Sequence, residues 1–231
     1  MARTRWLPIK RLLTRLGSHA GERSVYLLNG AFNYFHIGWW LAANGFDTRT
    51  RVGSRYEIFD RIAVDVGGRR TLYLEFGVFE GASLDYWAKL LRDPDARLHG
   101  FDSFVGLPYD WGLEGHEKGT FSTNRRIPTF DDERIEIFDG WFEETLPAYE
   151  WPEHDALVVM LDADLYSSTS TALRHVRDKL VPGSYLYFDE LHHRSDELRA
   201  FAEFLEDNPE MTFELVCATH ELSEVAFRRV A

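Results

Sequence analysis

The sequence is poor in cysteine, with a single one among its 231 residues. Cys217 therefore has no partner for a disulfide within the chain, and a reducing compartment such as the cytoplasm is the expected location. It lies in the apolar run 213–218, which favours a buried packing role over that of a nucleophile. The start of the chain also lacks the long apolar stretch of a secretory signal.

Positive charge is scarce, because 26 Lys and Arg face 38 Asp and Glu and the formal net charge is −12. Nucleic acid is thereby disfavoured as the main partner, since phosphate binding requires a basic surface. No apolar run reaches the length that spans a bilayer, so we expect no membrane-embedded segment. The N-terminus alone is basic, and a solvated helix face is favoured there over a membrane-surface arm. Its basic residues are Arg3, Arg5, Lys10, Arg11 and Arg15.

From Thr71 onward, short apolar runs alternate with amphipathic ones, the pattern of βαβ units around a parallel sheet. Strands are predicted at 71–76, 97–101, 134–138, 156–161, 184–188, 211–218 and 225–230. Helices are predicted at 82–92, 168–179 and 195–206. A short turn between the last two strands favours an antiparallel hairpin. The predicted fold class is therefore α/β, a Rossmann-like and mostly parallel sheet over residues 71–231 with helices on both faces.

Residues 1–70 are predicted to form a helical N-terminal extension. Phe32, Phe35, Trp39 and Trp40 recur at near-helical spacing. Packing on the sheet or on a second subunit is the favoured explanation, which leaves a homodimer open, and a lid over the substrate is the alternative. The aperiodic segment 106–133 is too long for an ordinary connection and is predicted to be an ordered loop bordering the active site.

A glycine turn follows the first predicted strand of the sheet and extends from Gly77 to Gly81. Glycine has no Cβ, so a ligand can approach the backbone closely there. Asp102 follows Gly81 by 21 residues, where a carboxylate can accept hydrogen bonds from ribose hydroxyls. Many strand–helix turns contain glycine for steric reasons alone, but the added carboxylate points to an adenosine-containing cofactor.

The turn departs from the G-x-G-x-x-G pattern of dinucleotide sites. Phe79 replaces the second glycine, and Glu80 adds negative charge where a pyrophosphate would lie. That charge suits S-adenosylmethionine, which carries a sulfonium and an ammonium group. Methyl transfer is therefore favoured over hydride transfer, and a nicotinamide-dependent oxidoreductase is the alternative.

Acidic residues follow two further predicted strands, as Asp162 and Asp164 after 156–161 and as Asp189-Glu190 after 184–188. If these strands are neighbours, about 4.8 Å apart, Asp162 and Asp189 meet at the edge where α/β sheets bind ligands. Helix capping would explain one such acid. Four at one edge repel each other, which favours a divalent cation, Mg²⁺ by preference.

Four segments resemble the macrocin O-methyltransferase family of class I S-adenosylmethionine-dependent enzymes. They are Gly100–Pro108, Lys118–Asn124, Leu161–Thr169 and Phe188–Glu190. The resemblance extends over about residues 73–204 and implies a seven-stranded sheet whose last strand is antiparallel. Residues 1–70 match no motif of the family, so substrate specificity is not predicted.

The resemblance also implies roles for individual residues. Asp164 would be the general base, and Asp162, Asp189 and Glu190 would bind Mg²⁺, although typical members have a second aspartate in place of Glu190. By their position directly after the acidic pair, His192 and His193 are rival bases or ligands, and they rank behind Asp164. The predicted cofactor contacts are Glu75, Gly77, Gly81, Ser83, Asp102, Ser103, Gly140 and Trp141, with Gly140-Trp141 bordering the adenine.

The function that we expect is a Mg²⁺-assisted O-methylation of a small hydroxylated molecule, such as a sugar or a natural product. Mg²⁺ would orient the substrate hydroxyl and lower its pKa, and Asp164 would accept the proton. A non-catalytic module that has kept the fold is a further alternative. The retained acidic pairs argue against it, because an inactive relative has no need for mutually repelling charges.

Overall fold

The computed structural model describes residues 6–111 and 115–231, so Arg3 and Arg5 lie outside the described residues. The strands are β1 (Arg51–Val52), β2 (Thr71–Phe76), β3 (Arg97–Asp102), β4 (Ile135–Asp139), β5 (Ala156–Leu161), β6 (Tyr185–Phe188), β7 (Phe213–Thr219) and β8 (Val225–Arg229). The α-helices are α1 (Leu7–Gly17), α2 (Glu22–Ala43), α3 (Arg55–Val66), α4 (Ala82–Leu90), α5 (Phe142–Thr145), α6 (Tyr166–Val176) and α7 (Glu197–Asp207), and short 3₁₀ turns η2 (Leu146–Ala148) and η3 (Arg177–Lys179) follow α5 and α6.

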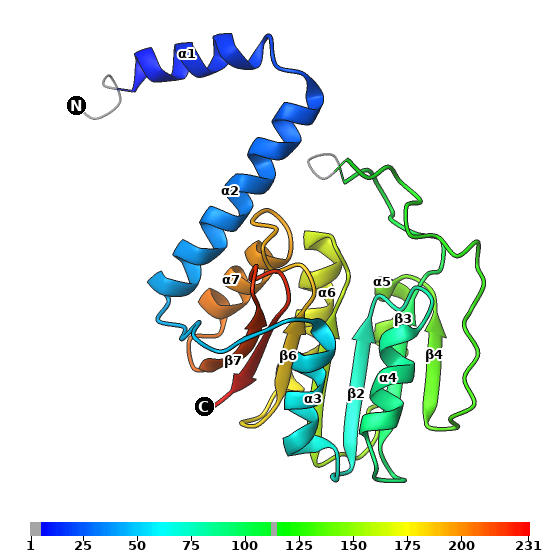
Figure 1. Cartoon of the computed structure of the whole chain (residues 1–231). Helices are drawn as coiled ribbons and strands as arrows, with labels where there is room; N and C mark the ends of the chain where they lie inside the picture. Colours follow the sequence, from blue (N-terminus) through cyan, green and yellow to red (C-terminus); the bar gives the residue numbers. More distant parts are fainter. Residues whose placement is uncertain (1–5, 112–114) are drawn as a thin grey trace.

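The strands form one sheet in the order β1-β7-β8-β6-β5-β2-β3-β4 (Figure 1). All neighbouring pairs are parallel except those of β8, which runs antiparallel to both β6 and β7. The predicted fold class is confirmed, and all seven predicted strands are present. An eighth strand, the two-residue β1, was not predicted; it pairs with β7 at the sheet edge.

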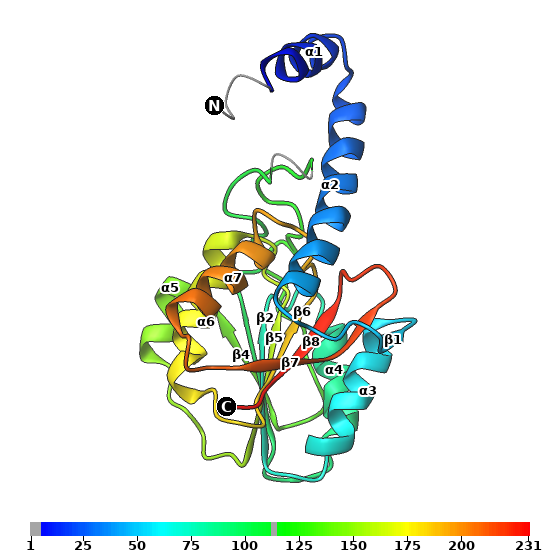
Figure 2. The ribbon, with the colours of Figure 1, turned by 90° about the vertical axis from the view of Figure 1, so that its left-hand side faces the viewer.

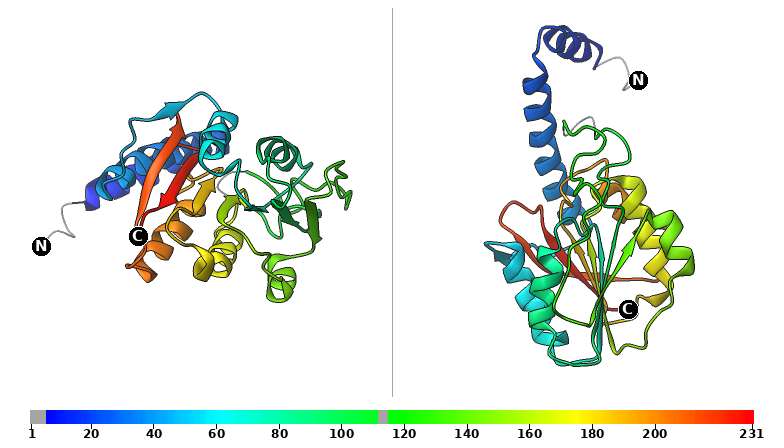
Figure 3. Two further views of the ribbon diagram at one scale, coloured as in Figure 1. Left: turned by 90° about the horizontal axis from the view of Figure 1, so that it is seen from below. Right: turned by 90° about the vertical axis from the view of Figure 1, so that its right-hand side faces the viewer.

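Helices cover both faces of the sheet (Figures 2 and 3). Buried residues of α3 and α4 pack on one face, and those of α6, α7 and the C-terminal half of α2 pack on the other. Strand β5 shows why the sequence folds in this way. It is apolar at every position, so that Leu157, Val159 and Leu161 face one helical layer while Val158 and Met160 face the other.

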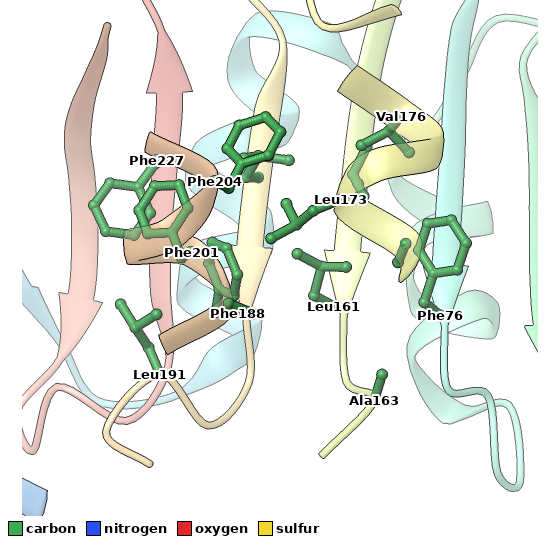
Figure 4. Close-up of a cluster of buried hydrophobic side chains, with 14 of the residues drawn as sticks. Phe76, Leu161, Ala163, Leu173, Val176, Phe188, Leu191, Phe201, Phe204 and Phe227 are labelled. Atoms are coloured by element: carbon green, nitrogen blue, oxygen red, sulfur yellow. The ribbon is translucent and has the colours of Figure 1, made fainter. Parts of the chain in front are cut away.

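The core between the sheet and helices α6 and α7 is rich in aromatic rings (Figure 4). Phe188 of β6 packs on Phe201 of α7 with ring centroids 4.8 Å apart, and Phe201 packs equally closely on Phe227 of β8. Burying rings of this size contributes much of the hydrophobic free energy that holds the layers together. The layer fixes β5 and β6 side by side, which positions the loops that follow them.

The N-terminal helices differ from the rest of the described chain in how little they pack. Helix α1 has no buried residue, and α1 and the first half of α2 extend away from the sheet (Figure 1). Of the predicted aromatic stripe only Trp40 is buried, while Phe32, Phe35 and Trp39 are exposed. The prediction that these three rings pack on the sheet is therefore wrong. Helix α2 turns a different side, with Ile37 and Trp40, towards the core.

No helix within residues 6–111 and 115–231 combines the length and the apolar character that crossing a lipid bilayer requires.

Candidate functional site

The strand register places the predicted site at one edge. Phe76 of β2 lies beside Phe101 of β3 and beside Leu161 of β5, and Leu161 lies beside Phe188 of β6. The residues that follow these positions therefore emerge together at the carboxyl ends of four neighbouring parallel strands. A cavity of about 710 Å³ opens there.

Nine of the twelve predicted site residues line this cavity. They are Gly77, Asp102, Ser103, Gly140, Trp141, Asp162, Asp164, Asp189 and Glu190. The other three are not brought into it. Glu75 is buried in β2, Ser83 is buried in the first turn of α4, and Gly81 lines a separate hollow beside Phe130.

Gly77 occupies a position that only glycine fits. Its φ is +96°, and a Cβ there would lie 1.8 Å from the backbone oxygen of Asp162. The end of β2 thus lies against the loop after β5 with no side chain between them. This close approach joins the glycine turn to the acidic side of the cavity.

Asp102 binds the glycine turn through its carboxylate. Its Oδ2 accepts hydrogen bonds from the backbone N–H groups of Val78 and Phe79, both at 2.8 Å, and its Oδ1 accepts one from Phe104 at 2.8 Å. A carboxylate offers about four acceptor positions, so one remains for a ligand. Asp102 holds the shape of the turn, and its contact with ribose stays a prediction.

The segment between β3 and β4 contributes one wall of the cavity through Leu107, Tyr109 and Phe121. Its first half closes on itself, because the backbone N–H of Leu107 donates a hydrogen bond of 2.9 Å to Thr120 and the N–H of Gly119 donates one of 2.9 Å to Leu107. The described part of the loop is therefore ordered and borders the site, as predicted. Residues 112–114 lie outside the described residues.

Arg55, the first residue of α3, reaches the acidic side of the cavity. Its Nη2 donates a hydrogen bond of 2.5 Å to Oδ2 of Asp189, and its Nη1 lies 3.6 Å from Oδ2 of Asp162. Its Nε lies 3.6 Å from Oε1 of Glu224 in the turn between β7 and β8. Arg55 was not among the predicted site residues, because no sequence pattern placed the start of α3 near the ends of β5 and β6.

The carboxyl groups of Asp162 and Asp189 have pKa values above their ordinary range. Burial, together with the charge of Asp189, raises the pKa of Asp162 well above its usual range. Burial raises the pKa of Asp189 to about 6, although Arg55 and a hydrogen bond from Tyr187 oppose the shift. One guanidinium therefore does not fully offset the cost of burying these two carboxylates.

Asp164 has a backbone conformation that is unusual for a residue with a side chain. Its φ is +56°, in the left-handed region that Asp tolerates better than most residues. The conformation directs the chain from β5 into α6, and the side chain lines the cavity. Burial, followed by the charges of Glu190 and Asp189, raises the pKa of Asp164 to about 8.

Glu75 lies below the cavity and makes no part of its lining. The hydroxyl of Tyr73 donates a hydrogen bond of 2.6 Å to Oε2 of Glu75. Burial raises the pKa of Glu75 to about 8. Its predicted contact with a cofactor is not visible in this arrangement, because the side chain is enclosed by the sheet and the helices above it.

Glu190 interacts with the residues that follow it. Its Oε2 lies 3.1 Å from Nδ1 of His193, and its backbone N–H donates a hydrogen bond of 3.0 Å to Oε2 of the buried Glu197. His192 stacks on Tyr34 of α2 with ring centroids 4.7 Å apart, and neither histidine lines the cavity. Their rank behind Asp164 as candidate bases stays a prediction.

The side chains as arranged do not fit a magnesium ion bound by Asp162, Asp189 and Glu190. Among residues 6–111 and 115–231, no three His, Cys, Asp or Glu side chains gather closely enough to hold a metal ion. Asp189 already binds Arg55 and Tyr187 through its two oxygens, and Glu190 is paired with His193. The predicted magnesium site stays a prediction.

Comparisons with known proteins identify the family of the chain. The family model described as macrocin-O-methyltransferase (TylF) matches residues 59–216. The chain is 30% identical over 138 residues to the 8-demethyl-8-(2,3-dimethoxy-alpha-L-rhamnosyl)-tetracenomycin-C 4'-O-methyltransferase of Streptomyces olivaceus, covering 51% of each chain. It is 29% identical over 137 residues to the demethyldecarbamoylnovobiocin O-methyltransferase of Streptomyces niveus, again covering 51% of each. The chain thus spans about half the length of these curated relatives.

Solved structures resemble this chain as well. The calicheamicin methyltransferase CalS11 superimposes with a TM-score of 0.58 at 25% identity, over 75% of this chain and 76% of CalS11. An O-methyltransferase from Bacillus cereus, solved in complex with SAH, superimposes with a TM-score of 0.50 at 13% identity, over 86% of this chain and 90% of that one. The second likeness shows the fold alone.

Proposed function

The chain belongs to the macrocin-O-methyltransferase family, and from this premise we propose that it methylates a hydroxyl group of a small molecule with S-adenosylmethionine as donor. The observation that supports this most is the single cavity that joins the glycine turn and Asp102 to the carboxylates after β5 and β6. When bound, S-adenosylmethionine supplies an activated methyl group, and its transfer leaves S-adenosylhomocysteine.

The predicted cofactor contacts divide into two sets. Gly77, Asp102, Ser103, Gly140 and Trp141 line the side of the cavity formed by β2, β3 and β4, where the nucleoside is proposed to bind. Glu75, Gly81 and Ser83 lie outside the cavity. We propose that they stabilise the glycine turn and α4 and do not contact the cofactor directly.

We assign the role of general base to Asp164, whose carboxylate would accept the proton that the substrate hydroxyl loses. A base works best when its pKa lies near the working pH, and the pKa of Asp164 is raised to about 8. Holding the hydroxyl in line with the methyl group is a proximity effect that can lower the barrier by about 7–11 kcal/mol in favourable cases.

The proposed acceptor is a hydroxylated sugar or natural product, because the relatives named above act on such molecules according to their descriptions. The wall formed by Tyr109 and Phe121 offers apolar and aromatic surface for a sugar ring. Magnesium assistance remains a prediction that the present arrangement does not support, so no step depends on it. Loss of turnover in EDTA and its recovery with Mg²⁺ would support magnesium assistance. Undiminished turnover in EDTA would contradict it.

The proposal is tested by calorimetric titration of the purified chain with S-adenosylhomocysteine and with NAD, followed by a screen of hydroxylated compounds for uptake of labelled methyl. We expect binding of S-adenosylhomocysteine and transfer of label to a sugar or natural product. Binding of NAD alone would favour the oxidoreductase, and cofactor binding without transfer to any acceptor would favour the non-catalytic module.

We also propose a homodimer through one side of α2. Val25, Leu28, Phe32, Phe35 and Trp39 are spaced by three and four residues in alternation, the heptad pattern of a coiled-coil seam. Each of these side chains is at least 45% exposed. Residues beside the seam include Ala31 and Gly38, small side chains that allow two helices to approach closely.

The area of this α2 seam is compatible with a dimer. Each aromatic ring can bury about 150–250 Å², so three from each copy approach the about 1,200 Å² at the lower end of stable interfaces. We expect Phe35→Glu to convert a dimer to a monomer in sedimentation analysis, and Val64→Glu on the exposed side of α3 to leave it unchanged. A wild-type monomer at micromolar concentration would contradict the proposal.

A cytoplasmic location of the protein also stays a prediction.

A further inference from the structure

Arg55 is unusual among the residues of the cavity in both its charge and its origin. The described lining contains six acidic residues, namely Asp102, Glu143, Asp162, Asp164, Asp189 and Glu190, and Arg55 is the one lysine or arginine among the described lining residues. It lies at the start of α3, before residue 59, where the match to the family model begins. The matched segment therefore does not account for the positive charge of this site.

The guanidinium of Arg55 is held in place but not saturated by its carboxylate neighbours. Only its contact with Asp189, at 2.5 Å, has hydrogen-bond length. The contacts with Asp162 and Glu224 are 3.6 Å long, which is beyond a hydrogen bond. A guanidinium has five N–H donors in a planar fork that suits a carboxylate, so it can bind another anion beside Asp189.

Arg55 also carries its charge throughout the working range of pH. Burial opposes the charge, but the carboxylates of Asp189 and Asp162 more than offset this, and the pKa of Arg55 is raised above its ordinary value. The side chain is 29% exposed, so it can be reached from the cavity while its position is fixed by packing.

The methyl donor ends in an amino-acid group that carries both an ammonium and a carboxylate. The ammonium suits the acidic side of the cavity, but the carboxylate would be repelled by the ionised acidic side chains of the lining unless a cation accompanied it. From this complementarity we infer that Arg55 binds the carboxylate of the amino-acid end of S-adenosylmethionine. The inference rests on the proposed function.

The positions of the surrounding residues agree with this orientation. Asp102 fixes the turn after Gly77 on the nucleoside side, and Gly77 lies directly against the backbone of Asp162. Asp162 in turn lies beside Arg55. A ligand that extends across the bare glycine turn would therefore have its nucleoside beside Asp102 and its amino-acid end beside Arg55.

The experiment compares two ligands by calorimetry with the full chain. S-adenosylhomocysteine has the amino-acid end, whereas 5′-methylthioadenosine has the same nucleoside and thioether without it. In Arg55→Met we expect the affinity for S-adenosylhomocysteine to fall about 10- to 150-fold, as for the loss of a hydrogen bond between charged groups. The affinity for 5′-methylthioadenosine should stay within about threefold, because this ligand has no carboxylate for Arg55 to bind.

A matched control is Arg51→Met. Arg51 lies four residues earlier and donates its hydrogen bond to the backbone oxygen of Thr219, away from the cavity lining. We expect it to change neither affinity. If Arg55→Met does not fold, Arg55→Lys keeps the charge but loses the fork, and it should weaken S-adenosylhomocysteine alone by about tenfold.

A purely structural role for Arg55, as partner of Asp189, gives a different result. In that case the double variant Arg55→Met/Asp189→Asn should bind S-adenosylhomocysteine as tightly as Asp189→Asn does, because the carboxylate of Asp189 is no longer left without its partner. Such a result, or an equal loss for both ligands in Arg55→Met, would overturn the inference. Wild-type protein that binds neither ligand would instead refute the proposed function, so the two failures are distinguishable.

Discussion

The two sides of the cavity satisfy their negative charges in different ways. On the side of β2 and β3, the carboxylate of Asp102 accepts three backbone hydrogen bonds of 2.8 Å. On the side of β5 and β6, Asp162 and Asp189 lie beside one guanidinium, and both of them and Asp164 have raised pKa values. The first side is preorganised by the backbone, whereas the second has charge that a ligand or a proton must compensate. This difference is typical of a site that holds a cofactor on one side and does proton chemistry on the other.

The largest effect that we expect comes from the charged side. Asp164→Asn removes the proposed base but keeps the shape of the side chain, so turnover should fall by about 10²- to 10⁴-fold. Binding of S-adenosylhomocysteine should persist, because it does not require the base. Methyl transfer to an acceptor found by the screen gives the first quantity and calorimetry the second. Turnover close to that of the wild type would remove Asp164 from this role.

The next effect concerns the preorganised side. Asp102→Ala leaves the N–H groups of Val78, Phe79 and Phe104 without their acceptor, which costs about 1–3 kcal/mol for each group left unsatisfied. The glycine turn should loosen, and the affinity for S-adenosylhomocysteine should fall by about tenfold or more. Asp139→Ala is a control, because Asp139 lies beside Asp102 in the register but does not line the cavity. Equal affinities of the two variants would contradict the role given to Asp102.

The smallest effect is on the pH dependence of stability. Burial raises the pKa of Glu75 from 4.5 to about 8, so between these values the folded state binds more protons than the unfolded state. The free energy of unfolding should therefore decrease as the pH rises through this window, by up to about 1.4 kcal/mol per pH unit for one such group. Glu75→Gln cannot ionise and should reduce the decline, measured by urea unfolding at pH 5.5 and pH 7.5. Parallel declines in the variant and the wild type would show that Glu75 does not contribute.

Much of the site was predictable because strand ends are visible in a sequence. The apolar runs 71–76, 156–161 and 184–188 gave the strands to within one residue, and the residues after them line the cavity. The spacing of Asp102 from the glycine turn gave a second point of the site. The direction of individual side chains was less accessible, so that Glu75, Gly81 and Ser83 were placed in the site although they lie outside its lining.

Amphipathic periodicity indicated helices near the N-terminus but not which side of them meets the sheet. Trp39 and Trp40 illustrate this, because they are neighbours on one helix but lie in opposite environments. The exposed fraction of Trp39 is 58%, whereas that of Trp40 is 8%. Periodicity reports that a helix has an apolar stripe, whereas the partner of that stripe depends on packing geometry. Helix α2 has apolar residues on more than one side, which is why the sequence did not decide between them.

The sequence by itself determined where the strands of the sheet lie along the chain, the class of fold and the placement of acidic residues at the ends of β5 and β6. These follow from the alternation of apolar and polar residues, which acts within each element. Only the tertiary structure decided that Arg55, more than a hundred residues away from Asp189 along the chain, supplies the positive charge between the carboxylates. An ion pair between distant residues has no local pattern, because it depends on how separately folded elements pack against one another.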